Sequence, residues 1–307
     1  MIMEEIKFEV LIPNESLYDL IEKNDRLKNK YILSEINDFE DGSWRYERFN
    51  NYIMNNVALT TLSIEEQNKI PENHFTSIQK ACRNLRILPN ADAGKGSEIA
   101  EILLYAVMKD YFNALPAVPK IFYKQNVNDY AKGADGVHIV LNEDDFSLWY
   151  GEAKFYKDFS SQIDTIVDSV FNSLTSAKIR KENSVMTNLN DLNLILDGNP
   201  QKDKILNFLK PDTSTDDIKK KLHIPIMILY ECQITSQEIN LTDEYKEKIK
   251  KEQLENAIKY FQKQDNKCLS SVFNYESITF HLILFPVPNK TLVVDKFMNI
   301  AKVLRGE

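Results

Sequence analysis

The stretch GADGVHIVLNEDDFSLWYGEAK, residues 133–154, decides the expected fold. Two strand-like runs, residues 137–141 and 147–155, are separated by the acidic turn at residues 142–145. Two short apolar runs joined by a few turn residues are typical of a β-hairpin. The rest of the chain is interpreted around this hairpin.

Three residues in this stretch have a joint chemical use. Glu152 and Lys154 are two positions apart and therefore share one face of a strand, and Asp135 stands at the mouth of the preceding run. Two carboxylates supply oxygen ligands for Mg²⁺, and a lysine can orient or polarise an attacking water. Because two close carboxylates repel each other unless a cation neutralises them, we expect a metal-dependent site.

The neighbours of Glu152 and Lys154 favour a site over an exposed ion pair at a strand edge. Aromatic residues precede and follow the pair, so the strand is expected to be largely buried, and buried charges need a partner or a metal. The small residues Gly151 and Ala153 are expected to leave room for the metal. The backbone carbonyl of Ala153 is then a further metal ligand.

A third acid is expected on a helix that begins near Ser97 and covers residues 98–112. Glu98 flanks the apolar side of this helix, whereas Glu101 points to solvent, so Glu98 is the preferred metal ligand. For either residue the alternative is an acid that only favours the positive end of the helix dipole.

Two polar residues near the hairpin have open roles. Gln162, at the start of an amphipathic helix, either contacts a phosphate or the attacking water, or simply faces solvent. His138 has the wrong strand parity to share a face with Asp135 and is expected to be structural.

The N-terminal part predicts a mostly helical region over residues 1–90. After a first strand at residues 6–12, ended by Pro13, apolar residues recur at helical intervals in three segments, residues 15–30, 43–62 and 73–88. The turn-rich segment at residues 89–96 then marks the boundary to a second domain, residues 91–307.

The second domain predicts an α/β fold with a mixed sheet flanked by helices. Its expected elements are a helix at 98–112, a strand at 121–125, the hairpin, a helix at 163–174, short helices and loops at 181–221, a strand at 224–232, a helix at 241–261, a strand at 277–285 and a helix at 292–304. The runs at 224–232 and 277–285 are almost continuously apolar, which is typical of strands buried on both faces.

Composition indicates a cytoplasmic protein that does not enter a membrane. The start of the chain lacks the features of a signal peptide, no apolar run approaches about 18 residues, and the three cysteines are scattered. The net charge of -8 is unusual for a DNA-binding protein, because phosphate binding relies on Lys and Arg. Small basic surpluses lie in residues 176–222 and 246–267, and a partner subunit is another source of positive charge.

The order of these motifs resembles the PD-(D/E)XK nuclease core, which is restriction-endonuclease-like. The chain also resembles the HamA family of the Hachiman anti-phage defence system, over roughly residues 85–307. Three segments carry this resemblance: GSEIAEILLY (residues 96–105), GADGVHIVL (133–141) and WYGEAKF (149–155). The resemblance implies a Mg²⁺-dependent DNA nuclease, with Mn²⁺ as a substitute, that works with a HamB-like superfamily 2 helicase. It places Asp135, Glu152 and Lys154 in the catalytic positions, while Ala134 stands where the literal motif has Pro.

The expected function is therefore cleavage of DNA phosphodiester bonds by the effector of a defence complex. Two alternatives stay open: a free-standing restriction-type endonuclease, and a subunit that binds DNA or a partner without catalysis. The acidic charge counts against the first, and the intact Asp135, Glu152 and Lys154 count against the second.

Overall fold

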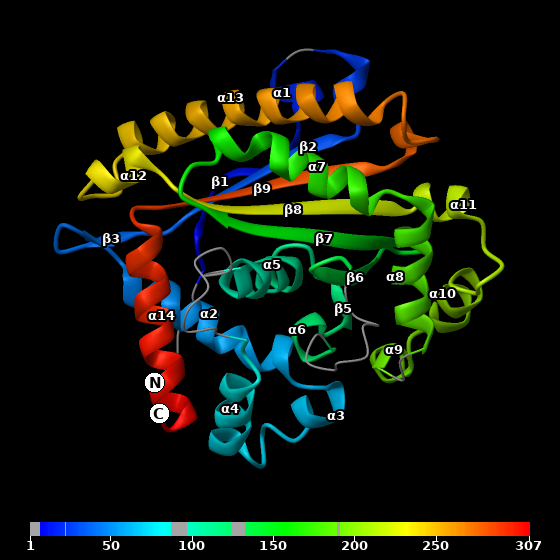
Figure 1. Ribbon diagram of the computed structural model, residues 1–307, viewed down its shortest axis with the longest axis horizontal. Coiled ribbons are helices and arrows are strands. Elements are labelled where there is room, and N and C mark those ends of the chain that lie inside the picture. Colours follow the sequence, from blue (N-terminus) through cyan, green and yellow to red (C-terminus); the bar gives the residue numbers. More distant parts are fainter. Residues whose placement is uncertain (1–6, 22, 87–96, 124–132, 189–190) are drawn as a thin grey trace.

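The computed structural model of the chain describes residues 7–21, 23–86, 97–123, 133–188 and 191–307. Its centre is a seven-stranded sheet with the strand order β1-β2-β9-β8-β7-β6-β5 (Figure 1). Neighbours from β2 through β9 and β8 to β7 are parallel, whereas β1 at one edge and β6 and β5 at the other are antiparallel. The expected mixed sheet is thus confirmed. Its strands are β1 (Glu9–Ser16), β2 (Lys30–Ile36), β5 (Leu115–Val118), β6 (Gly136–Leu141), β7 (Phe146–Tyr156), β8 (Leu222–Glu231) and β9 (Thr279–Val287), and a separate pair is formed by β3 (Phe39–Glu40) and β4 (Ser43–Trp44).

Helices cover both faces of this sheet (Figure 1). Helices α7 and α13 pack against each other on one face, α5 and α2 lie on the opposite face with α14 beside α2, and α8 to α11 gather at the end near β5. The longer helices are α2 (Tyr46–Thr61), α4 (His74–Arg83), α5 (Ser97–Asp110), α7 (Ile163–Ser173), α8 (Ser176–Asn188), α13 (Asp243–Cys268) and α14 (Lys290–Arg305). The shorter ones are α1 (Leu17–Leu20), α3 (Ile64–Gln67), α6 (Lys120–Tyr123), α9 (Asp191–Ile195), α10 (Lys202–Phe208), α11 (Thr215–Lys219) and α12 (Gln233–Gln237), with 3-10 turns η1 (Asp25–Leu27), η2 (Ser160–Gln162) and η3 (Tyr275–Ser277).

The middle of the sheet is the core of the molecule. Nearly every residue of β8 and β9 is buried, because helices cover both faces of these parallel strands. The strands expected at 224–232 and 277–285 are therefore confirmed, as is the hairpin β6–β7. The helices expected at 43–62, 73–88, 98–112, 163–174, 241–261 and 292–304 correspond to α2, α4, α5, α7, α13 and α14.

The N-terminal part differs from the expected helical region. The helix expected at residues 15–30 is wrong, because β1 continues to Ser16 and α1 has only four residues. Pro13 does not end β1, since an edge strand tolerates proline on its unpaired side. The unexpected strand β2 pairs in parallel with β9, with Ile32 opposite Leu282.

The sheet also crosses the division expected at residues 90 and 91, because β1 and β2 belong to the same sheet as the later strands. The turn-rich segment at 89–96 lies outside the described residues. The division into two domains therefore stays a prediction.

The strand expected at residues 121–125 is also wrong. Residues 120–123 form α6, and the third strand beside the hairpin is β5, which contains Pro116. β5 is the edge of the sheet, where a proline costs no ladder hydrogen bond with a further strand.

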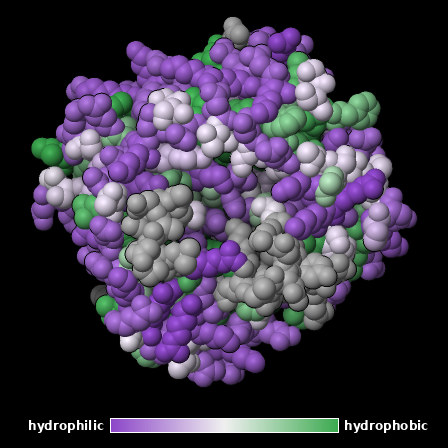
Figure 2. Space-filling view, viewed as in Figure 1, coloured by the Kyte–Doolittle hydropathy of each residue, from purple (hydrophilic) through white to green (hydrophobic). Residues whose placement is uncertain are grey.

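The face of the molecule shown in Figure 2 is mostly hydrophilic, with apolar side chains in small groups. Among the described residues, no helix combines the length and the apolar character needed to cross a bilayer.

Candidate active site

The register between β6 and β7 places Asp135 beside the middle of β7. Gly136 pairs with Gly151, and the N–H of Asp135 donates to the carbonyl of Gly151 at 2.7 Å. β6 begins at this point while β7 continues to Tyr156, so β7 extends past the start of its neighbour. Asp135 takes the position next to this extension, where its Oδ2 accepts the N–H of Ala153 at 3.0 Å.

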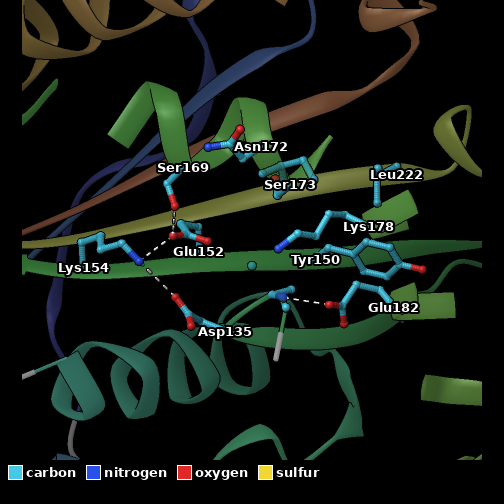
Figure 3. Close-up of a pocket in the computed structure, with 14 residues that line it drawn as sticks. Asp135, Tyr150, Glu152, Lys154, Ser169, Asn172, Ser173, Lys178, Glu182 and Leu222 are labelled. Carbon is cyan, nitrogen blue, oxygen red and sulfur yellow. Dashed lines mark hydrogen bonds and ion pairs between the residues drawn. The ribbon is translucent and has the colours of Figure 1, made fainter. Parts of the chain in front are cut away.

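The three predicted residues meet at this position (Figure 3). The Nζ of Lys154 lies 2.5 Å from Oε1 of Glu152 and 3.5 Å from Oδ2 of Asp135. The same Oε1 accepts a hydrogen bond from the hydroxyl of Ser169 on α7, at 2.5 Å. The shared face of Glu152 and Lys154, and the nearness of Asp135, are as the sequence predicts.

Burial strengthens the electrostatic interactions among Asp135, Glu152 and Lys154. The side chains of Asp135 and Glu152 are only 13% and 11% exposed, and that of Lys154 is 29% exposed. Burial, followed by the charge of Asp135, raises the pKa of Glu152 above its ordinary value, although Lys154 and Ser169 act in the opposite direction. Burial alone would lower the pKa of Lys154, but the two carboxylates outweigh it, so that this pKa is raised. The lysine is thus held as a cation between two acids.

Gly151 was expected to leave room for a metal, but in the structure it leaves room for a side chain of α5. A Cβ added to Gly151 would lie 2.6 Å from Cδ2 of Leu104 on α5, and one added to Gly136 would lie 3.4 Å from the same atom. The position that a side chain of Gly151 would take is therefore filled by Leu104 and does not hold a metal, although Gly151 itself lines the cavity beside Glu152. The small residues allow α5 to pack closely against β6 and β7.

The cluster opens into a cavity of about 340 Å³ between β7, α7 and α8. Tyr150, two residues before Glu152, lies on the same strand face and lines this cavity. From α8 come Lys178 and Glu182, and Oε1 of Glu182 accepts the N–H of Ala134 at 2.9 Å. Helix α8 therefore holds the turn that leads into Asp135.

Sequence reasoning missed the residues that α7 and α8 contribute. Tyr150 could have been found from strand parity with Glu152. Ser169 lies within the amphipathic α7, and its polar side chain beside the apolar stripe was a weak signal. Nothing in the local sequence of Lys178 or Glu182 indicates that α8 returns to the hairpin.

The third acid expected on the helix, Glu98, has a partner outside the carboxylate pair. Its Oε1 accepts the N–H of Arg86 at 2.7 Å, and Glu98 does not line the cavity described above. Glu101, which was expected to point to solvent, is half-buried. Among the residues that the structure describes, no group of three or more His, Cys, Asp and Glu side chains has the arrangement of a metal site. The helix acid as a third ligand therefore stays a prediction.

The two other polar residues lie apart from the carboxylates. Gln162, at the end of η2, is half-buried, its amide nitrogen lies 3.4 Å from the Ser161 hydroxyl, and it does not line the cavity. His138 is buried with its ring 5.3 Å from that of Tyr105. Burial lowers the pKa of His138 to about 3, so it is neutral at physiological pH, which fits the structural role expected for it.

Comparison with known proteins adds family membership to this geometry. No curated protein matches the chain. The family model HamA matches residues 10–301, a range that runs from β1 into the last helix, α14, and includes the hairpin with Asp135, Glu152 and Lys154. The chain therefore belongs to the HamA family, which is associated with Hachiman anti-phage defence.

Proposed function

We propose that this chain is a Mg²⁺-dependent DNA nuclease with a PD-(D/E)XK core and that it acts as the effector of a defence complex. The observation that carries this proposal is the meeting of Asp135, Glu152 and Lys154 in one cavity. The ammonium of Lys154 lies 2.5 Å from the carboxylate of Glu152 and 3.5 Å from that of Asp135. Membership of the HamA family supports the defence context.

The donor atoms at the site fit Mg²⁺. The carboxylates of Asp135 and Glu152 are hard oxygen ligands. A strand residue directs its N–H and its C=O toward the same neighbour, and the N–H of Ala153 points to Asp135, so the carbonyl of Ala153 lies on that side as well. Burial, followed by the charge of Asp135, raises the pKa of Glu152 despite the presence of Lys154, and a bound cation would act against both effects. Mn²⁺ prefers the same oxygen ligands and is expected to substitute.

The residues of the chain have separate tasks in this proposal. A Mg²⁺ ion bound by Asp135, Glu152 and the Ala153 carbonyl would supply Lewis-acid chemistry for hydrolysis of a phosphodiester. Lys154, kept as a cation by the two acids, directs its remaining hydrogen toward the attacking water or a phosphate oxygen. Ser169 fixes the carboxylate of Glu152 from the other side of the cavity. A contribution from Glu98, directly or through water, is an additional part of the proposal.

Charge supports a partner for this activity. A net charge of -8 repels DNA at long range, and the site adds two further acids. We therefore propose that a HamB-like helicase brings DNA to the chain and controls cleavage. Restraint of the isolated chain would also protect the DNA of its own cell.

The test of catalysis is cleavage of plasmid DNA by the complex purified from co-expression with its neighbouring genes. Mg²⁺ or Mn²⁺ should support cleavage and excess EDTA should stop it. Glu152→Gln and Lys154→Ala should each reduce the rate by at least about 100-fold, which is the usual loss when a catalytic group is removed.

Lys157→Ala is the matched control, because Lys157 is an exposed lysine just after β7. It should cleave as the wild type does. Wild-type cleavage by Glu152→Gln, at equal protein and Mg²⁺, would exclude the proposed site.

The test of the partner compares DNA affinity and cleavage of the chain alone with those of the co-expressed complex. The lone chain should bind DNA weakly and cut it slowly. Tight binding and full cleavage by the lone chain, with no protein co-purifying from native expression, would instead identify a free-standing restriction-type nuclease.

A further inference from the structure

The wall of the cavity opposite β7 carries a second lysine. Lys178, in the first turn of α8, lines the same cavity as Glu152, and its ammonium projects into that cavity (Figure 3). Lys154 is already paired with two acids. Lys178 is exposed and makes no hydrogen bond or ion pair with the residues that the structure describes.

A neighbouring amide extends this wall. Asn172, near the end of α7, also lines the cavity and is exposed. Within the described part of the chain, its side-chain amide has no hydrogen-bonding partner. The start of α8 adds the positive end of a helix dipole at the same corner, which favours an anion.

The charges around the cavity indicate a role for Lys178 and Asn172. Asp135, Glu152 and Glu182 contribute three carboxylates, and Lys154 is held between the first two. A polyanion that approached this site would meet repulsion from the acids. Lys178 is a cation in the lining that forms no ion pair within the described part of the chain, so its ammonium is available to an incoming anion.

We propose that Lys178 is a phosphate-binding residue of this site and that Asn172 assists it. The ammonium binds a non-bridging oxygen of the DNA backbone and so positions the strand against the carboxylates of β7. The contact is to phosphate, so it adds affinity without selecting sequence. This inference rests on the proposed nuclease function, because it assigns Lys178 to the substrate of the same cavity.

The experiment measures DNA binding by the co-expressed complex in Ca²⁺, at several salt concentrations, and DNA cleavage in Mg²⁺. Lys178→Ala should weaken binding several-fold for unrelated sequences and reduce the slope of log affinity against log salt by about 1, as expected for one lost phosphate contact. In cleavage, KM should rise while kcat stays close to the wild-type value. Lys178→Arg, which keeps the charge, should restore most of the affinity.

Arg180→Ala is the matched control. Arg180 is an exposed cation on α8, two residues from Lys178, that does not line the cavity, so its removal changes the net charge equally. Equal effects of Lys178→Ala and Arg180→Ala on affinity and salt slope would overturn the inference. A loss in kcat with unchanged KM would overturn it too, since Lys178 would then act in the transition state.

The nuclease proposal can fail separately from this inference. If Glu152→Gln abolishes cleavage while Lys178→Ala matches its control, the nuclease stands and the inference falls. If the wild-type complex neither binds nor cuts DNA, both fall.

Discussion

The hydroxyl of Ser169 donates a hydrogen bond to Oε1 of Glu152 at 2.5 Å, and that oxygen also pairs with Lys154. This contact ties helix α7 to the strand that carries the site. It also favours the ionised form of Glu152, because it opposes the effects of burial and of Asp135 on the pKa of that residue.

Ser169→Ala should therefore weaken metal binding and cleavage without unfolding the chain. We expect a loss of about 10-fold, since removal of a group that orients a metal ligand typically costs 10–100-fold. The measurement is the Mg²⁺ concentration that gives half-maximal cleavage. Ser173→Ala is the control, because Ser173 also lies on α7 and lines the cavity but donates to the Val170 carbonyl. If both variants behave alike, the Ser169 contact does not position Glu152.

Gly133→Ala should disturb the turn before Asp135. A Cβ on Gly133 would lie 1.6 Å from Oε1 of Glu182, so this carboxylate would have to leave the N–H of Ala134. Loss of this buried hydrogen bond should lower the free energy of unfolding by about 1–3 kcal/mol and reduce cleavage. Urea denaturation and the plasmid assay measure the two effects.

The control for Gly133→Ala is a double-mutant cycle with Glu182→Ala. Once the Glu182 carboxylate is absent, the added methyl group has space, so the two substitutions should cost less together than the sum of their separate effects. Strict additivity would show that the methyl group acts on something other than Glu182.

Gly151→Ala should destabilise the protein through the packing of α5. The new Cβ would meet Cδ2 of Leu104 at 2.6 Å and Cγ of Pro225 at 3.4 Å, and overpacking of this kind costs typically about 1–3 kcal/mol. Chemical denaturation of the variant measures the cost. Leu104→Val in the same chain should recover part of it, whereas an equally stable Gly151→Ala protein would contradict the close approach of α5.

Glu35, on β2, should make stability depend on pH. Burial, followed by the charge of Asp110, raises its pKa from 4.5 to about 7. The folded state then holds the proton more tightly than the unfolded state does, so the stability contributed by this proton is complete below about pH 4.5 and is lost as the pH rises through about 7.

Glu35→Gln removes this ionisation. Relative to the wild type, the variant should gain stability between about pH 5 and pH 8, by at most about 3 kcal/mol, since one pKa unit corresponds to about 1.4 kcal/mol. Urea denaturation at the two pH values measures this gain. Glu47→Gln, at an exposed position, controls for the loss of one negative charge. A gain no larger than that of the control would mean that the pKa of Glu35 is not raised in the folded protein.

The hairpin and its three residues could be predicted because their information is local. Strand parity places Glu152 and Lys154 on one face, and a turn of fixed length returns Asp135 to them. Lys178 and Glu182 could not be predicted, because they reach the cavity only after α7 and α8 have crossed the sheet. The use of Gly151 was also ambiguous: a small residue leaves room either for a ligand or for a neighbouring side chain, and Leu104 fills it here.

The N-terminal strand β2 was also missed, because the local sequence does not contain its partner. Residues 30–36 form a strand that pairs with residues about 250 positions later, and no local pattern contains that partner. A proline is disfavoured in the interior of a sheet, and the edge position that makes Pro116 acceptable in β5 cannot be read from the local sequence. β8 and β9 could be predicted, although their partners are distant, because each is a continuous apolar run; β2 and β5 carry no local pattern of comparable strength.

The place of β9 between β2 and β8 has a consequence for synthesis on the ribosome. β9 is the last strand of the sheet to emerge from the ribosome. Until residues 279–287 are available, no strand connects β2 to β8. Such distant pairing makes folding slow and late. A chain that stops before β9 lacks the strand that joins β2 to β8, so the two parts of the sheet can assemble only after residues 279–287 have been synthesised.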